Sequence, residues 1–306
     1  MAIWIRTVDP QWFDFVSSRP EMAEINLWTP AGRRVLDGAE PGDLVLFRVR
    51  GRLGIAGYGL FFNVAIYFAA DAWRLFGPGN GAPTDAAFRA LVVAKHPVQR
   101  STFFPLGCHD IVEPVYLERR KGRLPEEAVR RLSGGPFDEG SSDGRLLLDF
   151  LEEAKSPARN AAEGGASPTL NRSRRRQVSA GRAGFQIALH NAYDRTCAIT
   201  GVTVLPALEA AHFIADQFGG PMDVRNGALL RRDFHPLVEQ GYMTVSDDYT
   251  VVFSKWLPRA YPQCETYLRF NRRKLRLPKD RHLWPAPHIL EQHRTTVFFK
   301  GGTLDG

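Results

Sequence analysis

The sequence predicts an α+β protein with two domains, and three observations support this fold class. Short strand-like runs separated by glycine turns, with two helical segments, occupy roughly the first 120 residues. A segment with little apolar periodicity follows, and the last part reads as strand, loop and helix. A chain of 306 residues is long enough for two cores. The expected parts are a domain over 1–122, a helical connector and basic linker over 123–181, and a second domain over 182–306.

The N-terminal elements predict a curved sheet or small barrel with flanking helices. Residues 44–49 and 53–62 are the expected strands of a hairpin, because Gly51 permits a tight reversal between them. Glycines interrupt the second of these strands. Helices are expected over 71–76 and 84–93, and another strand over 110–117.

The connector is predicted to hold one helix over 144–154, whose apolar residues form a single stripe. Residues 155–183 are rich in Ala, Gly, Ser, Asn and Pro, a composition typical of a flexible or only locally ordered linker. Arg174, Arg175 and Arg176 fall in this linker. They could follow a nucleic-acid backbone, or they could simply keep a tether solvated.

In the last part, a helix is expected over 182–193, a strand over 204–213, and a loop over 217–221, where Gly and Pro gather. Apolar residues at helical spacing predict a helix over 228–240, ended by Gly241. A closing helix is expected over 285–299.

Three polar residues of this part have a spacing that can form one site. His212 lies in the expected strand, Asn226 follows 14 residues later (226 − 212), and His235 another 9 later (235 − 226). The strand, loop and helix could present all three to one cleft around a divalent metal. A neutral imidazole can take a proton from water, while a hard cation stabilises charge on a phosphate, so phosphodiester cleavage suits this set.

Four segments in order resemble the HNH endonucleases with a ββα-metal fold. They are Cys-Ala-Ile-Thr-Gly at 197–201, Leu-Glu-Ala-Ala-His at 208–212, Asn-Gly at 226–227 and Leu-Arg-Arg-Asp-Phe-His at 230–235. The resemblance implies that His212 is the general base, that His235 is a metal ligand, and that Asn226 holds the loop and the base in place.

One position departs from that pattern. Many members of the broader superfamily carry a second metal ligand immediately before the base, where this chain has Ala211. Glu209, two residues back on the same strand face as Ala211, is the first candidate for that ligand, and Asp233 is the second. Oxygen-rich ligation favours Mg²⁺ or Mn²⁺, whereas a site dominated by histidine would admit Zn²⁺ or Ni²⁺. Arg231 and Arg232 could contact neighbouring phosphates.

The N-terminal part carries a weaker resemblance. Glu-Pro-Gly-Asp-Leu-Val-Leu-Phe at 40–47 and Gly-Ile-Ala-Gly-Tyr-Gly at 54–59 resemble the PUA-like group that includes EVE domains, some of which read modified bases. Such reading requires an extruded base between aromatic walls. Trp28, Phe47 and Tyr58 are the candidates for that pocket, and packing in the core is the alternative for each.

Composition sets the wider limits. The net charge of +7 suits a polyanionic partner. Cys108, Cys197 and Cys264 are widely spaced, so they predict buried small side chains rather than a zinc knuckle or disulfides. No apolar run is long enough to span a membrane, and the first residues lack the order of a signal peptide, so a cytoplasmic protein is expected.

Together these features predict a Mg²⁺-dependent DNA endonuclease, with Mn²⁺ or Ni²⁺ as alternative ions. The expected partner is double-stranded DNA, including DNA with modified bases, and the implied biology is restriction. A homodimer would suit double-strand cleavage. Two alternatives stay open: a nucleic-acid-binding protein whose nuclease site is degenerate at Ala211, and a nuclease that acts on RNA.

Overall fold

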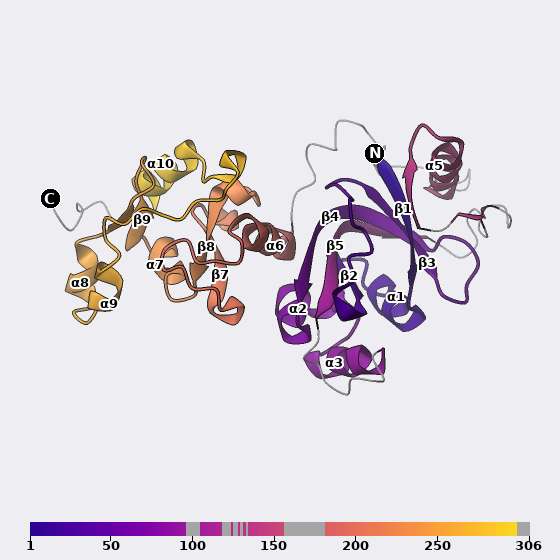
Figure 1. Cartoon of the computed structure of the whole chain (residues 1–306), viewed down its shortest axis with the longest axis horizontal. Helices are drawn as coiled ribbons and strands as arrows, with labels where there is room; N and C mark the ends of the chain where they lie inside the picture. The colour runs from indigo at the N-terminus through magenta and orange to yellow at the C-terminus, as the bar shows by residue number, and fades with distance from the viewer. Residues whose placement is uncertain are drawn as a thin grey trace, which may run out of the picture. The chain divides into compact units, whose positions relative to one another are not determined.

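The structure is a computed structural model that describes residues 1–95, 105–117, 124, 128, 131–132, 134–155 and 181–298. The chain divides into two compact units, Met1–Ala183 and Gly184–Gly306 (Figure 1). Each unit has its own sheet or sheets and its own helices, which confirms the α+β class.

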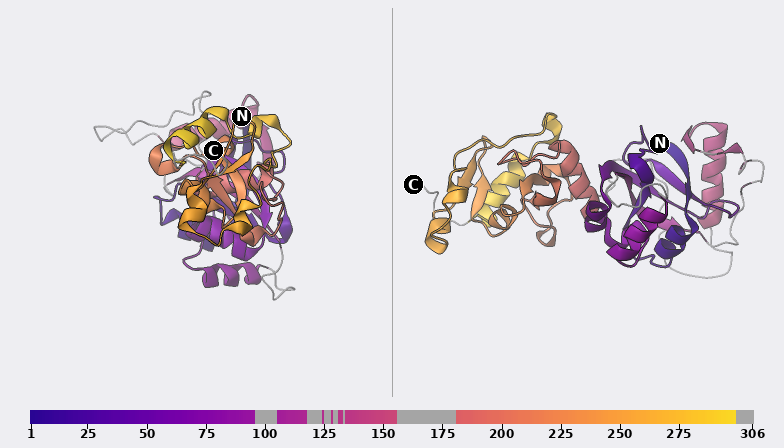
Figure 2. Two further views of the ribbon diagram at one scale, coloured as in Figure 1. Left: turned by 90° about the vertical axis from the view of Figure 1, so that its left-hand side faces the viewer. Right: turned by 60° about the horizontal axis from the view of Figure 1, so that its bottom comes forward.

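The N-terminal unit is built on one six-stranded mixed sheet (Figures 1 and 2). Its strands are β1 (Ala2–Val8), β2 (Glu24–Thr29), β3 (Leu44–Val49), β4 (Gly57–Tyr67), β5 (Leu106–Tyr116) and β6 (Gly134–Asp138). The spatial order is β2-β5-β4-β3-β1-β6. The β1–β3 pair is parallel, and the other neighbouring pairs are antiparallel.

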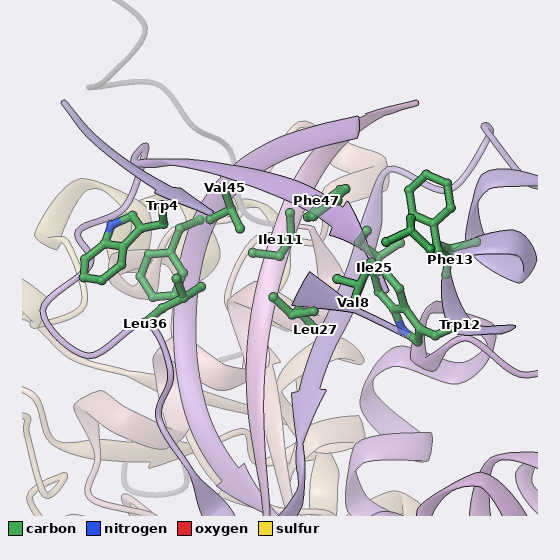
Figure 3. Close-up of a cluster of buried hydrophobic side chains, with 13 residues drawn as sticks. Trp4, Val8, Trp12, Phe13, Ile25, Leu27, Leu36, Val45, Phe47 and Ile111 are labelled. Carbon is green, nitrogen blue, oxygen red and sulfur yellow. The ribbon is translucent and has the colours of Figure 1, made fainter. Parts of the chain in front are cut away.

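Two apolar clusters cover the two faces of this sheet. Alternate residues of β3 separate them, since Val45 and Phe47 belong to one cluster and Leu44 and Leu46 to the other. The first cluster, shown in Figure 3, includes Trp12 and neighbouring residues of α1 (Pro10–Ser17). Helix α5 (Ser142–Lys155) packs into the second cluster, while α2 (Ala69–Phe76) contacts β2, β4 and β5 and also packs against α3 (Asp85–Ala94).

Several N-terminal elements match the prediction, and others were missed. The strand over 44–49 and the helices over 71–76, 84–93 and 144–154 are confirmed within a few residues. The second hairpin strand starts at Gly57 rather than 53 and continues to Tyr67, and β5 begins four residues before the predicted strand. Strands β1, β2 and β6 and helix α1 were not predicted from the sequence.

The C-terminal unit holds two small antiparallel sheets with short helices around them. Its elements are α6 (Arg182–Ala192), which begins at the end of the first unit, β7 (Leu208–His212), β8 (Gly227–Arg231), α7 (His235–Glu239), β9 (Met243–Val245), β10 (Val251–Phe253), α8 (Trp256–Ala260), α9 (Glu265–Leu268) and α10 (Pro287–Thr296). Strand β7 pairs with β8, and β9 with β10.

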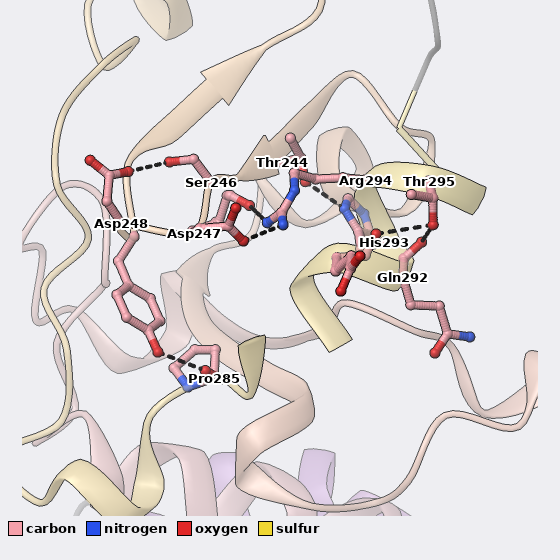
Figure 4. A network of polar contacts seen from close by, with 12 residues as sticks. Thr244, Ser246, Asp247, Asp248, Pro285, Gln292, His293, Arg294 and Thr295 are labelled. Carbon is pink, nitrogen blue, oxygen red and sulfur yellow. Dashed lines mark hydrogen bonds and ion pairs between the residues drawn. The ribbon is translucent and has the colours of Figure 1, made fainter. Parts of the chain in front are cut away.

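Helix α10 is tied to β9 by polar contacts (Figure 4). His293 is fully buried; its Nδ1 lies 2.7 Å from Thr244 Oγ1 and its Nε2 lies 3.1 Å from the carbonyl of Val238. Because a carbonyl only accepts, Nε2 carries the proton and Nδ1 accepts from the threonine hydroxyl. Arg294 pairs with Asp247 and donates to the carbonyl of Val245.

The prediction of one helix over 228–240 is wrong. Its first part is strand β8, and the helix begins only at His235. The apolar run Ala228–Leu229–Leu230 is buried without alternation, so its sequence does not distinguish a buried strand from a helix. Pairing with β7 makes it a strand, and Asn226 therefore lies at a loop-to-strand junction.

The remaining parts of the prediction have mixed outcomes. Helix α6 confirms the helix expected over 182–193, and α10 confirms most of the one expected over 285–299. The strand expected over 204–213 shortens to β7. Arg174, Arg175 and Arg176 lie outside the described residues. Within the described ranges, no helix has both the length and the apolarity that crossing a membrane requires.

Candidate active site

The candidate site is built on the β7–β8 hairpin and the helix that follows it. The register pairs His212 with Gly227 and Glu209 with Leu230. After β8 the chain turns once and enters α7, which packs back against β7. Two strands and a helix thus bring together residues that are up to 26 positions apart along the chain, from Glu209 to His235 (235 − 209).

His212 is the last residue of β7, and its ring stacks on Phe185 of α6. The two ring centroids are 3.8 Å apart and the planes differ by 8°. Gly227, opposite His212, makes room for this stack, because a Cβ there would lie 2.7 Å from Phe185 Cζ and 2.7 Å from the carbonyl oxygen of Ala211. The face of the imidazole is therefore covered and its plane is fixed by packing.

Asn226 braces the loop that leaves His212. Its side chain is fully buried, and Oδ1 accepts from the backbone N–H of Ile214 at 3.0 Å. Its Nδ2 donates to the carbonyls of Ile214 and Pro221 at 2.8 and 2.9 Å, and its own carbonyl accepts from the N–H of Phe213. Both ends of the loop between His212 and β8 are thus held by one amide.

His235, the first residue of α7, lies between two carboxylates. Its Nδ1 is 3.3 Å from Glu209 Oε2, and its Nε2 is 3.1 Å from Glu239 Oε1. Burial by itself lowers the pKa of His235, but the hydrogen bond to Glu209 and the charges of Glu239 and Glu209 outweigh it, so the pKa is raised. The structure thus brings His235 and Glu209 together, as the hypothesis of a shared ion requires.

Asp233 is paired with Arg231 and not with His235. Its carboxylate forms a two-fold ion pair with Arg231, at 2.7 and 2.6 Å. Burial opposes the charge, but hydrogen bonding and attraction from Arg231 lower the pKa of Asp233. The carboxylate and the guanidinium therefore satisfy one another, and neither is disposed as a metal ligand or phosphate donor here. Arg231 also ends a strand rather than lying on a helix with Arg232, which is exposed in the turn.

Three contributors were not identified from the sequence. Glu239 could have been found from its i+4 spacing to His235 on a helix. Phe185 could not, because nothing local connects α6 to β7. Cys197 is buried, and its Sγ accepts from the backbone N–H of Arg231 at 3.2 Å and of Thr200 at 3.4 Å, which ties the Cys-Ala-Ile-Thr-Gly turn to β8. Cys108 and Cys264 are likewise buried and free, as expected.

The donor chemistry fits a divalent cation with few protein ligands. Glu209 and His235 offer a carboxylate oxygen and an imidazole nitrogen to the same region. Across the described part of the chain, no three His, Cys, Asp or Glu side chains gather in a ready-made metal cage. Glu239 faces the other ring nitrogen, so it does not complete such a set. Mg²⁺ is commonly held by one or two carboxylates, with water and substrate phosphate as the remaining ligands.

The structure does not bring the three aromatic pocket candidates together. Phe47 is fully buried in the cluster beneath α1, whereas Tyr58 is buried in the cluster beneath α5, on the other face of the sheet. Trp28 is half-buried; its Nε1 donates to the carbonyl of Asn80, and its ring meets Phe88 edge-on. Packing of the two sheet faces explains Phe47 and Tyr58.

Comparison with known proteins agrees with the geometry of the C-terminal unit. Residues 197–246 match the HNH endonuclease family. No curated protein sequence matches the chain. Among solved structures, the chain is similar to a modification-dependent TagI restriction endonuclease at 12% identity and a TM-score of 0.30, over 97% of this chain and 83% of that one. So low a score supports no functional argument. Residues 197–246, which carry His212 on β7 and His235 at the start of α7, are therefore similar to the HNH endonucleases.

Proposed function

We propose that this chain is a metal-dependent nuclease that hydrolyses phosphodiester bonds in double-stranded DNA. The observation that supports the proposal most is the ordered HNH match over 197–246, which falls on the hairpin and helix that carry His212, Glu209 and His235. The net charge of +7 suits a polyanionic substrate. A role in the restriction of modified DNA is part of the proposal.

His212 is proposed as the general base. Its imidazole takes a proton from the attacking water, and the stack on Phe185 holds the ring plane while that proton moves. Asn226 is a positioning residue, since it fixes the backbone on the C-terminal side of His212.

Glu209 and His235 are proposed to hold the divalent cation, with Mg²⁺ expected and Mn²⁺ or Ni²⁺ as alternatives. A bound cation would offset the negative charge that builds up on the phosphate. Glu239, on the far side of the imidazole, orients His235 and strengthens its electron donation, as carboxylates behind metal-binding histidines do.

The N-terminal unit is proposed to recruit DNA, including modified DNA, as a PUA-like reader. Support comes from its curved mixed sheet with flanking helices and from the motif resemblance. Phe47 and Tyr58 are not part of this proposal, because they fill opposite faces of the core. Cleavage of plasmids with and without cytosine modification by the full chain would test it, and equal rates would contradict it. A homodimer is also proposed, and its test is the mass in solution.

The nuclease proposal is tested by plasmid cleavage with Mg²⁺, Mn²⁺, Ni²⁺ or EDTA. We expect cutting by the wild type only with a metal, and a loss of at least about 100-fold for His212→Ala, since general-base catalysis contributes that much. His282→Ala, at an exposed histidine of the same unit, is the matched control and should cut normally. Intact cutting by His212→Ala would refute the assignment.

A second function is favoured by one observation. Ala211 lies on the same strand face as Glu209 and has no ligand atom, and the described residues hold no three-residue metal cage. Retained DNA binding with no cleavage in any metal would make the chain a binding protein with a degenerate site. Parallel digestion of RNA and DNA distinguishes a nuclease specific for RNA.

A further inference from the structure

A dense basic segment follows α9 in the C-terminal unit. Residues 269–281 are 13 in number, and seven are basic against one acid, Asp280; the basic ones are Arg269, Arg272, Arg273, Lys274, Arg276, Lys279 and Arg281. The two lysines have acidic partners outside the segment, Asp248 and Asp194. The segment therefore concentrates positive charge, and the arginines provide most of it.

Three of these arginines lie over aromatic rings. The guanidinium carbons of Arg269 and Arg273 are 4.9 and 5.3 Å from the ring centroid of Phe270, and that of Arg281 is 5.1 Å from the ring of Trp284. All three arginines are exposed, although Phe270 is only 6% exposed. A guanidinium whose face rests on a ring keeps its N–H edge available and loses little side-chain entropy on binding, which suits two-point contact with phosphate.

The rings beneath them are fixed, so the arginines have defined places. Trp284 donates from Nε1 to the carbonyl of Pro278 at 2.7 Å and meets Tyr249 edge-on. The backbone of Arg273 accepts from the N–H of Val251 at 2.8 Å, which joins the segment to β10.

The segment is also continuous with the candidate active site. Phe270 packs edge-on against Phe234, with centroids 5.5 Å apart, and Phe234 immediately precedes His235. In the middle of the segment, the N–H of Arg276 donates to the carbonyl of Ala198, whose own N–H donates to the carbonyl of Leu229 on β8. The segment thus contacts the elements that hold the site at two points, Phe270 and Arg276.

We infer that Arg269, Arg273 and Arg281 form a phosphate-binding surface that holds the DNA backbone beside the cleavage site. This inference rests on the proposed function. It assigns the phosphate contacts to these three arginines instead of Arg231, whose charge is already neutralised by Asp233. The partner is double-stranded DNA, because guanidinium groups held over aromatic rings can bind backbone phosphates without requiring a particular base sequence.

The test measures binding of a 30-base-pair duplex to the full chain in a His212→Ala background, by fluorescence anisotropy at several salt concentrations. We expect Arg269→Gln/Arg273→Gln/Arg281→Gln to bind at least about tenfold more weakly near 0.1 M salt, and its log–log salt slope to flatten by about 2.7, or 0.9 for each lost contact. The same arginines replaced by lysine should keep most of the slope yet bind more weakly, since charge remains without the planar fork.

The matched control removes the same charge from elsewhere. Arg52, Arg89 and Arg131 each pair with a carboxylate, so Arg52→Gln/Arg89→Gln/Arg131→Gln should bind within about twofold of the parent. Equal weakening by both triple variants, or parent-like binding by the first, would overturn the inference. If the wild type still cuts plasmid in that case, only the assignment of Arg269, Arg273 and Arg281 as the phosphate-binding surface is wrong. If the parent binds no duplex, the proposed function fails as well.

Discussion

Buried polar side chains have opposite environments in the two units. Asn226 of the C-terminal unit is fully buried, and both atoms of its amide are hydrogen-bonded to backbone. Asp110 on β5 is equally buried, and its carboxyl faces the carboxyl of Glu24, with which it shares a side-chain hydrogen bond. The C-terminal unit therefore uses a buried amide to fix a loop, whereas the N-terminal unit holds a buried carboxyl whose pKa is raised by burial and by Glu24.

His109, next to Asp110 in sequence, is satisfied on the opposite face of β5. Its Nδ1 donates to the carbonyl of Leu27 at 2.8 Å, and its Nε2 accepts from the N–H of Val35 at 3.1 Å. Those partners require the neutral ring, because a proton on Nε2 would face a donor. The difference teaches that burial stabilises a polar group only in the protonation state that its partners demand.

The largest effect is expected from removing the buried amide of Asn226, both atoms of which are hydrogen-bonded. Asn226→Ala leaves two carbonyls and one N–H buried without a partner, so we expect a loss of about 3 kcal/mol or more in unfolding free energy. The loop after His212 should also loosen, and cleavage should fall well beyond what the unfolded fraction explains. Urea unfolding and plasmid cleavage measure the two. Asn191→Ala, exposed on α6, is the control, and an equal effect there would contradict the bracing role.

Acid should weaken the N-terminal unit through His109. Burial, followed by weaker repulsion from Arg6 and Arg34, lowers the pKa of His109 to about 4, against 6.5 in an open chain. The unfolded chain takes up this proton first as the pH falls from 6.5 to 4, so stability is lost in that window, by about 3 kcal/mol at 1.36 per pH unit. The unfolding free energy of His109→Gln should therefore fall less than that of the wild type between pH 6.5 and 4. An identical fall for both proteins would contradict the assignment.

A smaller effect is expected where α6 approaches the hairpin. The backbone of Gly227 is extended, so Gly227→Ala acts through crowding against Phe185 and the Ala211 carbonyl and should cost about 2 kcal/mol. Adding Phe185→Leu should recover part of the stability without recovering cleavage, because the ring that orients His212 is then missing. Recovery of both properties would show that the stack is only structural.

The smallest effect near neutral pH is expected for Asp110→Asn. Burial first, and the Glu24 charge second, raise the pKa of Asp110 well above its ordinary 3.8. The folded chain then keeps a proton that the unfolded chain releases, so stability falls as the pH rises above that ordinary value. The variant has no such proton, and its unfolding free energy should fall less on the alkaline side. A parallel pH dependence would mean that Asp110 is ionised and compensated.

Much of the site could be predicted from the sequence because its chemistry lies in short ordered segments. Leu208–His212 lies in an apolar and β-branched run that predicts a strand, and the positions of Asn226 and His235 can be recognised by spacing. The Ala228–Leu230 run could not be assigned correctly, since a buried strand and a buried helix look alike over three apolar residues. The strands β1 and β2 were missed for the same reason, since they are buried by partners 41 to 136 residues away (44 − 3 and 138 − 2).

The sequence by itself determined the polar set of the HNH-like segment, the α+β class and the excess of positive charge, because these depend on residue types and local order. Only the tertiary structure decided that Glu209 rather than Asp233 reaches His235, that Phe185 covers His212, and that aromatic rings support Arg269, Arg273 and Arg281. Each of these outcomes depends on which side chains are brought into contact from distant segments of the chain. Strand register and helix packing determine those contacts, and neither can be read from a single segment.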